Sequence, residues 1–273
     1  MNSKENKLLV AAIDFGTTYS GYAFVFKHED VSKINANTVW AGGSLMSLKC
    51  PTCVLFDENK KFHSFGYEAE DKYSDLANDD EHKRWYYFRR FKMSLHKKEI
   101  KRDVEIPDDK GLIMPAKKVF GSAIRFLKTH LLNTLESRGT GVAEKDILWV
   151  LTVPAIWSDA AKQFMREAAV SEAEIDSGAL IIALEPEAAS LYCQLLPSDK
   201  FSGSGRLTAN KYMILDLGGG TADITVHEKQ VDGSLRELHE PTGGAWGGTK
   251  VDEAFHQMLI KIIGAKTFKT FCD

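Results

Sequence analysis

The sequence predicts an α/β protein with a mixed sheet, divided into two lobes that share a cleft. Three observations support this fold class. Alternating apolar residues up to Phe65 indicate antiparallel strands. The pattern over residues 147–196 predicts buried strands that alternate with helices. A strand that ends in an Asp/Gly/Thr turn occurs twice, around Asp14 and around Asp216, which indicates two related halves. The Ser- and Gly-rich stretch 198–206 is the predicted boundary between them.

Composition and charge are those of a globular chain. Its 273 residues carry a formal net charge of −3, which gives no electrostatic reason to expect binding to nucleic acid or to an anionic membrane. Residues 1–7 are polar, and the short apolar run behind them does not have the character of a signal-peptide h-region. No apolar run approaches the roughly 18 residues that a membrane span needs. We therefore expect a cytoplasmic protein with neither a nucleic-acid nor a membrane partner.

The first strand and its turn form a candidate phosphate site. Residues 8–13 are an apolar run of strand length, Asp14 ends it, and Gly16 allows a tight reversal into an alternating second strand. Backbone N–H groups and the hydroxyls of Thr17 and Thr18 are suited to bind phosphate oxygens, while Asp14 faces the accompanying metal. An ordinary buried hairpin explains the same pattern when it occurs only once.

A second copy of the pattern strengthens the phosphate interpretation. An apolar strand over residues 212–215 ends in Asp216 and leads through a glycine-rich turn into another alternating strand. Three consecutive glycines in mid-chain cost backbone entropy, so they indicate a close approach of the backbone to a ligand. The turn and the acid behind it comprise Gly218, Gly219, Gly220, Thr221 and Asp223. Two such hairpins, one from each lobe, would hold phosphates from opposite sides of one cleft.

The segments after the first hairpin are expected to extend the sheet. A polar loop over residues 27–37 precedes a short strand over 38–40, and strands over 53–56 and 61–65 pair across a polar turn. A helix follows over residues 67–76.

Residues 81–95 are dense in charge and in aromatic rings. Basic side chains interleave with the rings at Arg84, Arg89, Arg90 and Lys92, which permits an RNA-stacking interpretation. The negative net charge and the acidic residues before this segment argue against it. A packed amphipathic segment is the preferred interpretation.

The middle of the chain alternates helices with apolar strands. A helix from Pro115 to about Arg138 carries one buried stripe and stops at Gly139. The continuous apolar run 147–153 is typical of a central strand covered on both faces. The remaining elements are a helix capped by Ser158, a buried strand over 179–184 and a helix over 187–196.

The C-terminal residues are expected to add a strand and an amphipathic helix to the second lobe. A strand over residues 234–239 leads to a glycine-rich loop, whose Gly247 and Gly248 open a helix N-terminus suited to bind an anion. Thr249 is the predicted N-cap of this helix, and Gly264 is its stop. The expected buried face comprises Val251, Phe255, Met258, Leu259 and Ile262.

Cys50 and Cys53 have the C-x-x-C spacing of zinc and redox sites. The sequence has no second C-x-x-C and no histidine pair at zinc-finger spacing to complete a structural zinc site. The apolar residues that follow favour buried strand cysteines instead, and reduced thiols agree with a cytoplasmic location.

Four carboxylates share one placement, because each sits at or just beyond the end of an apolar strand. They are Asp14, Glu185, Asp216 and Asp223. Ligands of open α/β sheets bind at strand ends, so these side chains are expected to converge on one site. Magnesium prefers oxygen ligands and keeps several waters, so few direct carboxylate contacts are needed. The sequence has neither a P-loop motif nor the G-x-G-x-x-G layout of a dinucleotide site.

Both hairpins resemble the phosphate motifs of the ATPase domain of the 70 kDa heat-shock protein family. The matching segments, two phosphate motifs and two intervening segments, are residues 13–20, 216–223, 150–155 and 184–189. The neighbourhoods of Gly66, Lys92 and Trp246 are most similar to the divergent heat-shock 70 kDa protein 12 subfamily. The resemblance extends over about residues 8–263.

This resemblance implies an actin-like, ribonuclease-H-like fold with ATP or ADP and Mg²⁺ held between the lobes. It implies a complete first lobe over residues 1–200 and a partial second lobe over residues 206–273, because the family's second lobe continues well beyond residue 264. That continuation carries most of the adenosine pocket in the family.

The resemblance also implies roles for individual residues. Asp14, Glu185 and Asp216 would hold magnesium-bound waters, and Asp223 would help to position the attacking water. The nucleotide contacts expected from the pattern and the resemblance together are Gly16, Thr17, Thr18, Tyr19, Gly218, Gly219, Gly220, Thr221, Gly247 and Gly248. Such a site acts by positioning the phosphoryl group and neutralising its charge.

The chain departs from the family pattern at two positions. The family's catalytic lysine should follow Gly66 by a few residues, but Glu70 occupies that place, with Lys72 as the nearby substitute. Lys162 stands where the family usually has an arginine. A carboxylate beside the terminal phosphate would repel it, so we expect a nucleotide-binding protein with weak or absent ATP hydrolysis and a protein partner that the sequence does not identify.

Two other functions are compatible with the pattern. The main alternative is a non-catalytic protein-interaction module that kept the fold and lost the nucleotide. A small-molecule kinase of the same superfamily shares both hairpins, but the segments around Pro154 and Glu185 argue against it.

Overall fold

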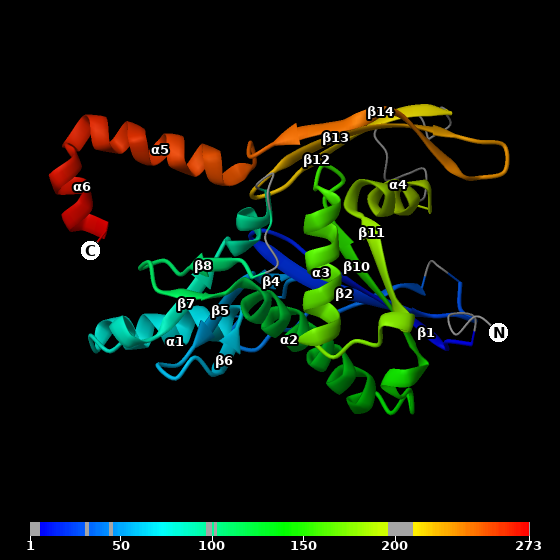
Figure 1. Ribbon diagram of the computed structural model, residues 1–273, viewed down its shortest axis with the longest axis horizontal. Coiled ribbons are helices and arrows are strands. Elements are labelled where there is room, and N and C mark those ends of the chain that lie inside the picture. The colour runs from blue at the N-terminus through cyan, green and yellow to red at the C-terminus, as the bar shows by residue number, and fades with distance from the viewer. Residues whose placement is uncertain are drawn as a thin grey trace.

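The computed structural model describes residues 6–30, 33–43, 46–96, 100, 103–195 and 210–272. We refer to residues 6–195 as the N-terminal part and to residues 210–272 as the C-terminal part. In Figure 1 the N-terminal part holds the large sheet, and the strands of the C-terminal part lie above it in this view, next to α4. The predicted boundary at 198–206 lies outside the described residues.

A six-stranded mixed sheet is the centre of the N-terminal part. Its strands follow the order β11–β10–β1–β2–β3, and β4 also pairs with β2. Pairing is parallel among β1, β10 and β11 and antiparallel from β1 through β2 to β3 and β4. The bounds are β1 Leu9–Phe15, β2 Tyr19–Phe26, β3 Asn35–Ala36, β4 Cys50–Pro51, β10 Ile147–Val153 and β11 Leu180–Leu184. The predicted α/β class with a mixed sheet is confirmed.

The parallel strands bring their carboxyl ends to one edge of this sheet. Ile13 of β1 pairs with Leu151 of β10, which in turn pairs with Ile182 of β11. Consequently Asp14 near the end of β1 and Glu185 just after β11 lie at the same edge, where ligands of α/β folds bind.

Two long helices cover one face of the large sheet (Figure 1). They are α2 Ala116–Ser137 and α3 Asp159–Ser171, which pack on each other. The predicted cap of α3 is confirmed, because the Ser158 hydroxyl accepts a hydrogen bond from the Ala161 N–H at 3.3 Å. Phe120 of α2 is fully buried and packs its ring against those of Phe15 and Phe91. This aromatic contact ties α2 to the strand that carries Asp14.

Smaller elements complete the N-terminal part. A three-stranded sheet in the order β6–β5–β7 packs with helix α1, and β8 pairs with β9. Their bounds, with those of the last helix, are β5 Cys53–Phe56, β6 Phe62–Phe65, α1 Tyr67–Asn78, β7 Tyr86–Arg89, β8 Glu105–Pro107, β9 Ile113–Pro115 and α4 Glu185–Leu195. The segment 81–95 is therefore a strand between two 3₁₀ turns, and Tyr87 and Phe88 are buried in it.

The C-terminal part is a three-stranded antiparallel sheet followed by two helices. The order is β12–β13–β14. The bounds are β12 Lys211–Leu217, β13 Ala222–Lys229, β14 Leu235–Gly244, α5 Gly248–Ile263 and α6 Ala265–Cys272. Among the described helices, none has the length and apolar character to cross a membrane.

Three local predictions are wrong. The short strand after the first hairpin is Asn35–Ala36 rather than residues 38–40, because the chain pairs with β2 at Ala23 and Phe24 before it turns away. The strand predicted over 234–239 continues to Gly244, because β14 pairs with β13 along its length. Thr249 is not an N-cap, because α5 already begins at Gly248.

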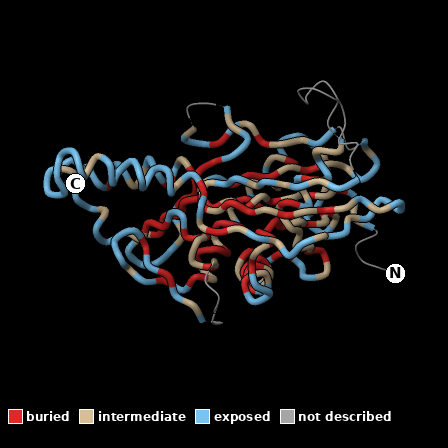
Figure 2. Tube along the Cα trace, turned by 90° about the horizontal axis from the view of Figure 1, so that it is seen from above, coloured by how far each residue is buried: buried red, intermediate tan, exposed pale blue. Residues whose placement is uncertain are grey.

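The expected buried face of α5 is exposed instead. Val251 is 71% exposed, Phe255 53% and Ile262 69%, and no residue of α5 is buried. Helix α6 packs on α5, but in Figure 2 the two helices form an exposed arm that extends away from the buried residues. An amphipathic stripe is buried only when another element packs on it, and in the described residues nothing covers this one.

Both cysteines of the C-x-x-C segment are buried strand residues, as the apolar context predicts. Cys50 lies in β4 and Cys53 in β5. The Cys53 thiol donates to the Gly66 carbonyl oxygen at 3.3 Å, and the Cys50 thiol donates to the Ser20 carbonyl oxygen at 3.7 Å. Burial raises the pKa of Cys50, and it raises the pKa of Cys53 to about 12, so both stay protonated near neutral pH.

Candidate functional site

A cleft of about 1150 Å³ lies between the two parts of the chain. Both hairpin turns, the end of β10 and the start of α4 contribute to its wall. The predicted site residues that line it are Asp14, Gly16, Thr17, Thr18, Tyr19, Glu185, Asp216, Gly218, Gly219, Gly220 and Thr221. Residues from opposite ends of the sequence therefore meet in one cavity. Asp223, Gly247 and Gly248 do not line it.

The first turn is shaped by hydrogen bonds that the strand pattern alone does not reveal. The Gly16 N–H donates to the Ser20 hydroxyl at 3.1 Å, and that hydroxyl lies 2.7 Å from the Thr52 hydroxyl. A β-carbon at Gly16 would lie 2.1 Å from the Tyr19 carbonyl oxygen, so only glycine fits the reversal. The turn thus places Thr17 and Thr18 at its tip, where their side chains pack against the second turn.

The second turn packs directly on the first. A β-carbon at Gly219 would meet the Thr18 hydroxyl oxygen at 2.2 Å, and one at Gly220 would meet a Thr17 methyl carbon at 2.6 Å. The loop is closed by the Gly218 N–H, which donates to the Thr221 carbonyl oxygen at 2.9 Å. The glycines are therefore needed for the contact between the two turns.

The glycines that open α5 support the second turn from behind. The Gly248 N–H donates to the Gly218 carbonyl oxygen at 3.1 Å, and the Gly247 N–H donates to the Gly220 carbonyl oxygen at 3.3 Å. The Thr249 N–H donates to the Gly219 carbonyl oxygen at 2.8 Å. The first N–H groups of this helix thus bind loop carbonyls, and the structure places them at the turn rather than in the cleft wall.

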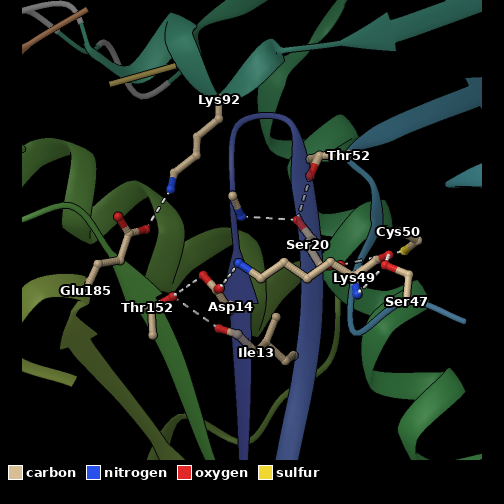
Figure 3. A network of polar contacts seen from close by, with 11 residues as sticks. Ile13, Asp14, Ser20, Ser47, Lys49, Cys50, Thr52, Lys92, Thr152 and Glu185 are labelled. Atoms are coloured by element: carbon tan, nitrogen blue, oxygen red, sulfur yellow. Dashed lines mark hydrogen bonds and ion pairs between the residues drawn. The ribbon is translucent and has the colours of Figure 1, made fainter. Parts of the chain in front are cut away.

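Two lysines pair with the carboxylates in the cleft, as Figure 3 shows. The Lys49 ammonium contacts Asp14 Oδ2 at 2.6 Å, while the Thr152 hydroxyl donates to Asp14 Oδ1 at 3.3 Å. The Lys92 ammonium contacts Glu185 Oε1 at 2.7 Å. Sequence reasoning gave neither lysine a role in the site, because each reaches its partner across a long sequence separation and no periodic pattern marks it.

The two ion pairs differ in depth. The Lys92 side chain is 4% exposed and its ammonium also lies over the Trp157 ring, whereas the Lys49 side chain is 47% exposed. Burial raises the pKa of Glu185, and Lys92 partly opposes this shift. Burial also raises the pKa of Asp216, and the charge of Asp14 raises it further. Concentrated negative charge of this kind is suited to a hydrated divalent cation.

Asp223 lies behind the second turn and is 2% exposed. The Thr221 hydroxyl donates to its Oδ2 at 3.0 Å, whereas Oδ1 has no hydrogen-bond partner among the described residues. Burial raises the pKa of Asp223, and the hydrogen bond from Thr221 partly opposes this shift. In this arrangement Asp223 orients Thr221 and does not face the cavity.

The residues at which the chain departs from the family pattern, and the nearby Lys72, lie outside the cleft wall. Glu70 is an exposed residue of α1, and the ammonium of Lys72 lies over the Trp85 ring at 6.0 Å from its centroid. Lys162 belongs to α3. None of the three lines the cavity, whose lining contains Lys49 and Lys92 as its basic residues within the described chain.

A magnesium ion would be held here mainly through water. Within the described ranges no three His, Cys, Asp or Glu side chains come close enough to form a metal cluster by themselves. Asp14, Glu185 and Asp216 nevertheless all line the same cavity. Separated carboxylates around a large cavity fit a hydrated Mg²⁺, which keeps most of its own waters.

The sheet topology, the paired Asp/Gly/Thr turns and the cleft between them define an actin-like ATPase fold. The family model of the Hsp70 protein matches residues 10–270. The chain therefore belongs to the Hsp70 family.

Similar proteins include two human members of this family. The chain is 39% identical to heat shock 70 kDa protein 12B of Homo sapiens over 318 aligned positions, which cover 96% of this chain and 46% of that protein. It is 36% identical to heat shock 70 kDa protein 12A of Homo sapiens, covering 99% of this chain and 48% of that protein. The chain thus spans about half the length of these relatives.

A solved structure of a non-polymerising MamK mutant bound to AMPPNP also resembles the chain. Its TM-score is 0.46 at 16% sequence identity, and the match covers 94% of this chain and 60% of that chain.

Proposed function

We propose that the chain binds ADP or ATP with Mg²⁺ in the cleft and hydrolyses ATP weakly or not at all. This proposal rests on the contact between the two Asp/Gly/Thr turns. The contact brings Thr17, Thr18, Gly219 and Gly220 together in the wall of the cavity. N–H and O–H donors of such turns bind phosphate oxygens. The family to which the chain belongs and the carboxylates that line the same cavity support the same ligand.

One group of residues would bind the phosphates, and another would hold the metal. Thr17, Thr18 and the loop 218–221 would bind phosphate oxygens, and Asp14, Glu185 and Asp216 would hold waters of the magnesium ion. Bound Mg²⁺ supplies charge neutralisation for the phosphates. The Thr152 hydroxyl keeps the Asp14 carboxylate oriented toward the cleft.

Weak turnover is supported by the placement of the acid–base groups. Asp223, the candidate for positioning an attacking water, faces Thr221 and does not line the cavity. Of the two basic residues of the cavity wall, Lys92 is buried and already paired with Glu185. Phosphoryl transfer depends on positioning and on charge stabilisation. This site offers more groups that position the phosphates than groups that stabilise their charge.

Isothermal titration calorimetry with ADP and ATP, each with and without Mg²⁺, tests the proposal. We expect magnesium-dependent heat from the wild-type chain and at least about a tenfold loss of affinity in Asp216→Asn, because a charged metal-water ligand is removed. Asp75→Asn, at an exposed position of α1, is the matched control and should bind normally. A folded wild-type chain that gives no heat with either nucleotide would refute the proposal.

A second candidate is a protein-interaction module without nucleotide. The exposed apolar residues of α5, including Phe255 and Ile262, favour it. The calorimetry separates the two functions, because this module would leave both nucleotides unbound while keeping the fold. A phosphate-release assay at saturating ATP then measures the turnover of a nucleotide-binding chain directly.

A further inference from the structure

Lys49 is a cation placed in the cleft by features unrelated to either phosphate turn. Its ammonium contacts Asp14 at 2.6 Å, and it lines the same cavity as Thr17 and Thr18. We propose that Lys49 is a phosphate-binding residue which the Asp14 carboxylate holds in place until a magnesium nucleotide enters. This inference rests on the proposed function and assigns one residue within it.

The path of Lys49 to Asp14 depends on Gly21. Asp14 and Gly21 are directly paired across β1 and β2. A β-carbon at Gly21 would lie 2.6 Å from the Leu48 carbonyl oxygen and 3.2 Å from Lys49 Cγ. The missing side chain thus leaves the space through which Lys49 crosses β2, and Figure 3 shows its side chain extended toward Asp14.

The backbone at Lys49 is fixed, while its ammonium is free to change partner. The Lys49 N–H donates to the Ser47 hydroxyl at 3.2 Å, and that hydroxyl donates to the Lys49 carbonyl oxygen at 2.7 Å. Both members of the Lys49–Asp14 pair are nearly half exposed, and such solvated pairs contribute little to stability. A flexible lysine can therefore leave Asp14 when a stronger anion is present.

Lys92, the other lysine of the cleft, is not free to leave its carboxylate partner. Lys92 is 4% exposed, pairs with Glu185 and packs over the Trp157 ring. Moving it would leave the buried Glu185 carboxylate without its partner, which is costly. Among the described lining residues, Lys49 is therefore the cation available to a phosphate.

Magnesium and phosphate would act on Lys49 in the same direction. If the Asp14 carboxylate held waters of a magnesium ion, it would bind the Lys49 ammonium less strongly. A phosphate group with at least two negative charges attracts the displaced ammonium more strongly than one carboxylate does. Lys49 then neutralises phosphate charge, while Asp14 becomes available to the metal.

The inference predicts that Lys49→Met has opposite effects on the binding of phosphate ligands and on the binding of a metal ion alone. We measure binding of Mg-ADP and of magnesium tripolyphosphate by calorimetry, and binding of Mn²⁺ alone by electron paramagnetic resonance. Lys49→Met should weaken both phosphate ligands by about tenfold or more, because it removes a charge-assisted hydrogen bond. It should tighten Mn²⁺ binding by about threefold, because Asp14 no longer has a competing cation. Lys49→Arg should retain phosphate binding within about threefold.

The matched control is Lys61→Met, which removes an exposed lysine outside the cleft wall. It should change neither the affinity for the phosphate ligands nor the affinity for Mn²⁺. If wild type binds Mg-ADP and Lys49→Met binds it equally well or more tightly, the role of Lys49 is refuted while the proposed function stands. Loss of both phosphate and Mn²⁺ binding in Lys49→Met would mean a structural role and would also refute it. A wild-type chain that binds neither phosphate ligand refutes both proposals.

Discussion

The two parts of the molecule carry the same strand–turn–strand pattern but bury it to different degrees. Alternate residues of β1 are fully buried, including Leu9, Ala11 and Phe15. The corresponding strand β12 has no buried residue, and its Met213 is 59% exposed and its Leu217 73%. Helix α2 lies against the large sheet, whereas α5 projects into solvent (Figures 1 and 2).

This comparison separates the causes of local and tertiary structure. Both hairpins form with matching registers, because Asp14 pairs with Gly21 and Asp216 with Asp223 at equivalent positions beside each turn. Strand periodicity and a glycine turn are therefore sufficient for the hairpin. Burial of its apolar face requires a covering layer. Helix α2 covers β1 in the N-terminal part, whereas α4 packs on β12 and β13 and leaves Met213 and Leu217 of β12 exposed.

The largest expected difference concerns two phenylalanines on helices. Phe120→Ala should lower the free energy of unfolding by about 3–5 kcal/mol, because it removes a fully buried ring from a packed aromatic cluster. Phe255→Ala on exposed α5 should change it by less than about 0.5 kcal/mol. Denaturant unfolding followed by circular dichroism measures both. Equal costs would mean that α5 is packed in solution and would remove the contrast.

A similar contrast is expected between two ion pairs. Lys92→Met should lower the free energy of unfolding by about 3–5 kcal/mol, because it leaves the buried Glu185 carboxylate unpaired. Arg236→Met breaks the solvated pair with Glu228 and should cost at most about 1 kcal/mol. The double variant Lys92→Met with Glu185→Leu should recover most of the loss. Failure to recover would attribute the cost to the Lys92 contact with Trp157 instead.

Thiol reactivity should distinguish the buried strands from the junction with the C-terminal part. The pKa of Cys53 is raised to about 12 by burial, so at pH 8 its thiolate fraction is more than about a thousandfold below that of an ordinary thiol. Cys193 on α4 is partly exposed and lines the cleft. Iodoacetamide labelling with mass spectrometry should therefore modify Cys193 first and Cys50 and Cys53 only after unfolding. Early labelling of Cys53 would show that β5 opens in the native state.

The smallest expected effect compares two buried threonines. Thr152→Val should lower the free energy of unfolding by about 1 kcal/mol, because its hydroxyl donates to Asp14 and lies 3.4 Å from the Ile13 carbonyl oxygen. The Thr225 hydroxyl is buried without a hydrogen-bond partner among the described residues. Thr225→Val should therefore be neutral or stabilising by up to about 1 kcal/mol. A clear loss of stability in Thr225→Val, measured by denaturant unfolding, would reveal an ordered water on that hydroxyl.

Much of the fold could be predicted because its signals are local. The two hairpins, the helix that starts after Pro115 and the cap at Ser158 follow from short-range periodicity and turn chemistry. The convergence of Asp14 and Glu185 also follows, because parallel strands end at one edge of a sheet. The strand inside 81–95 could not be assigned, because its dense charges and rings obscured the period of two.

The sequence by itself determined the fold class, the two Asp/Gly/Thr turns and the carboxylates at the strand ends, because each depends on neighbours within a few residues. Tertiary structure alone decided that Lys49 and Lys92 meet those carboxylates, since the contacts depend on the space at Gly21 and on a 3₁₀ turn far along the chain. It also decided that α5 stays exposed. An amphipathic pattern states which face a helix would bury, and only the packing of other elements determines whether that face is covered.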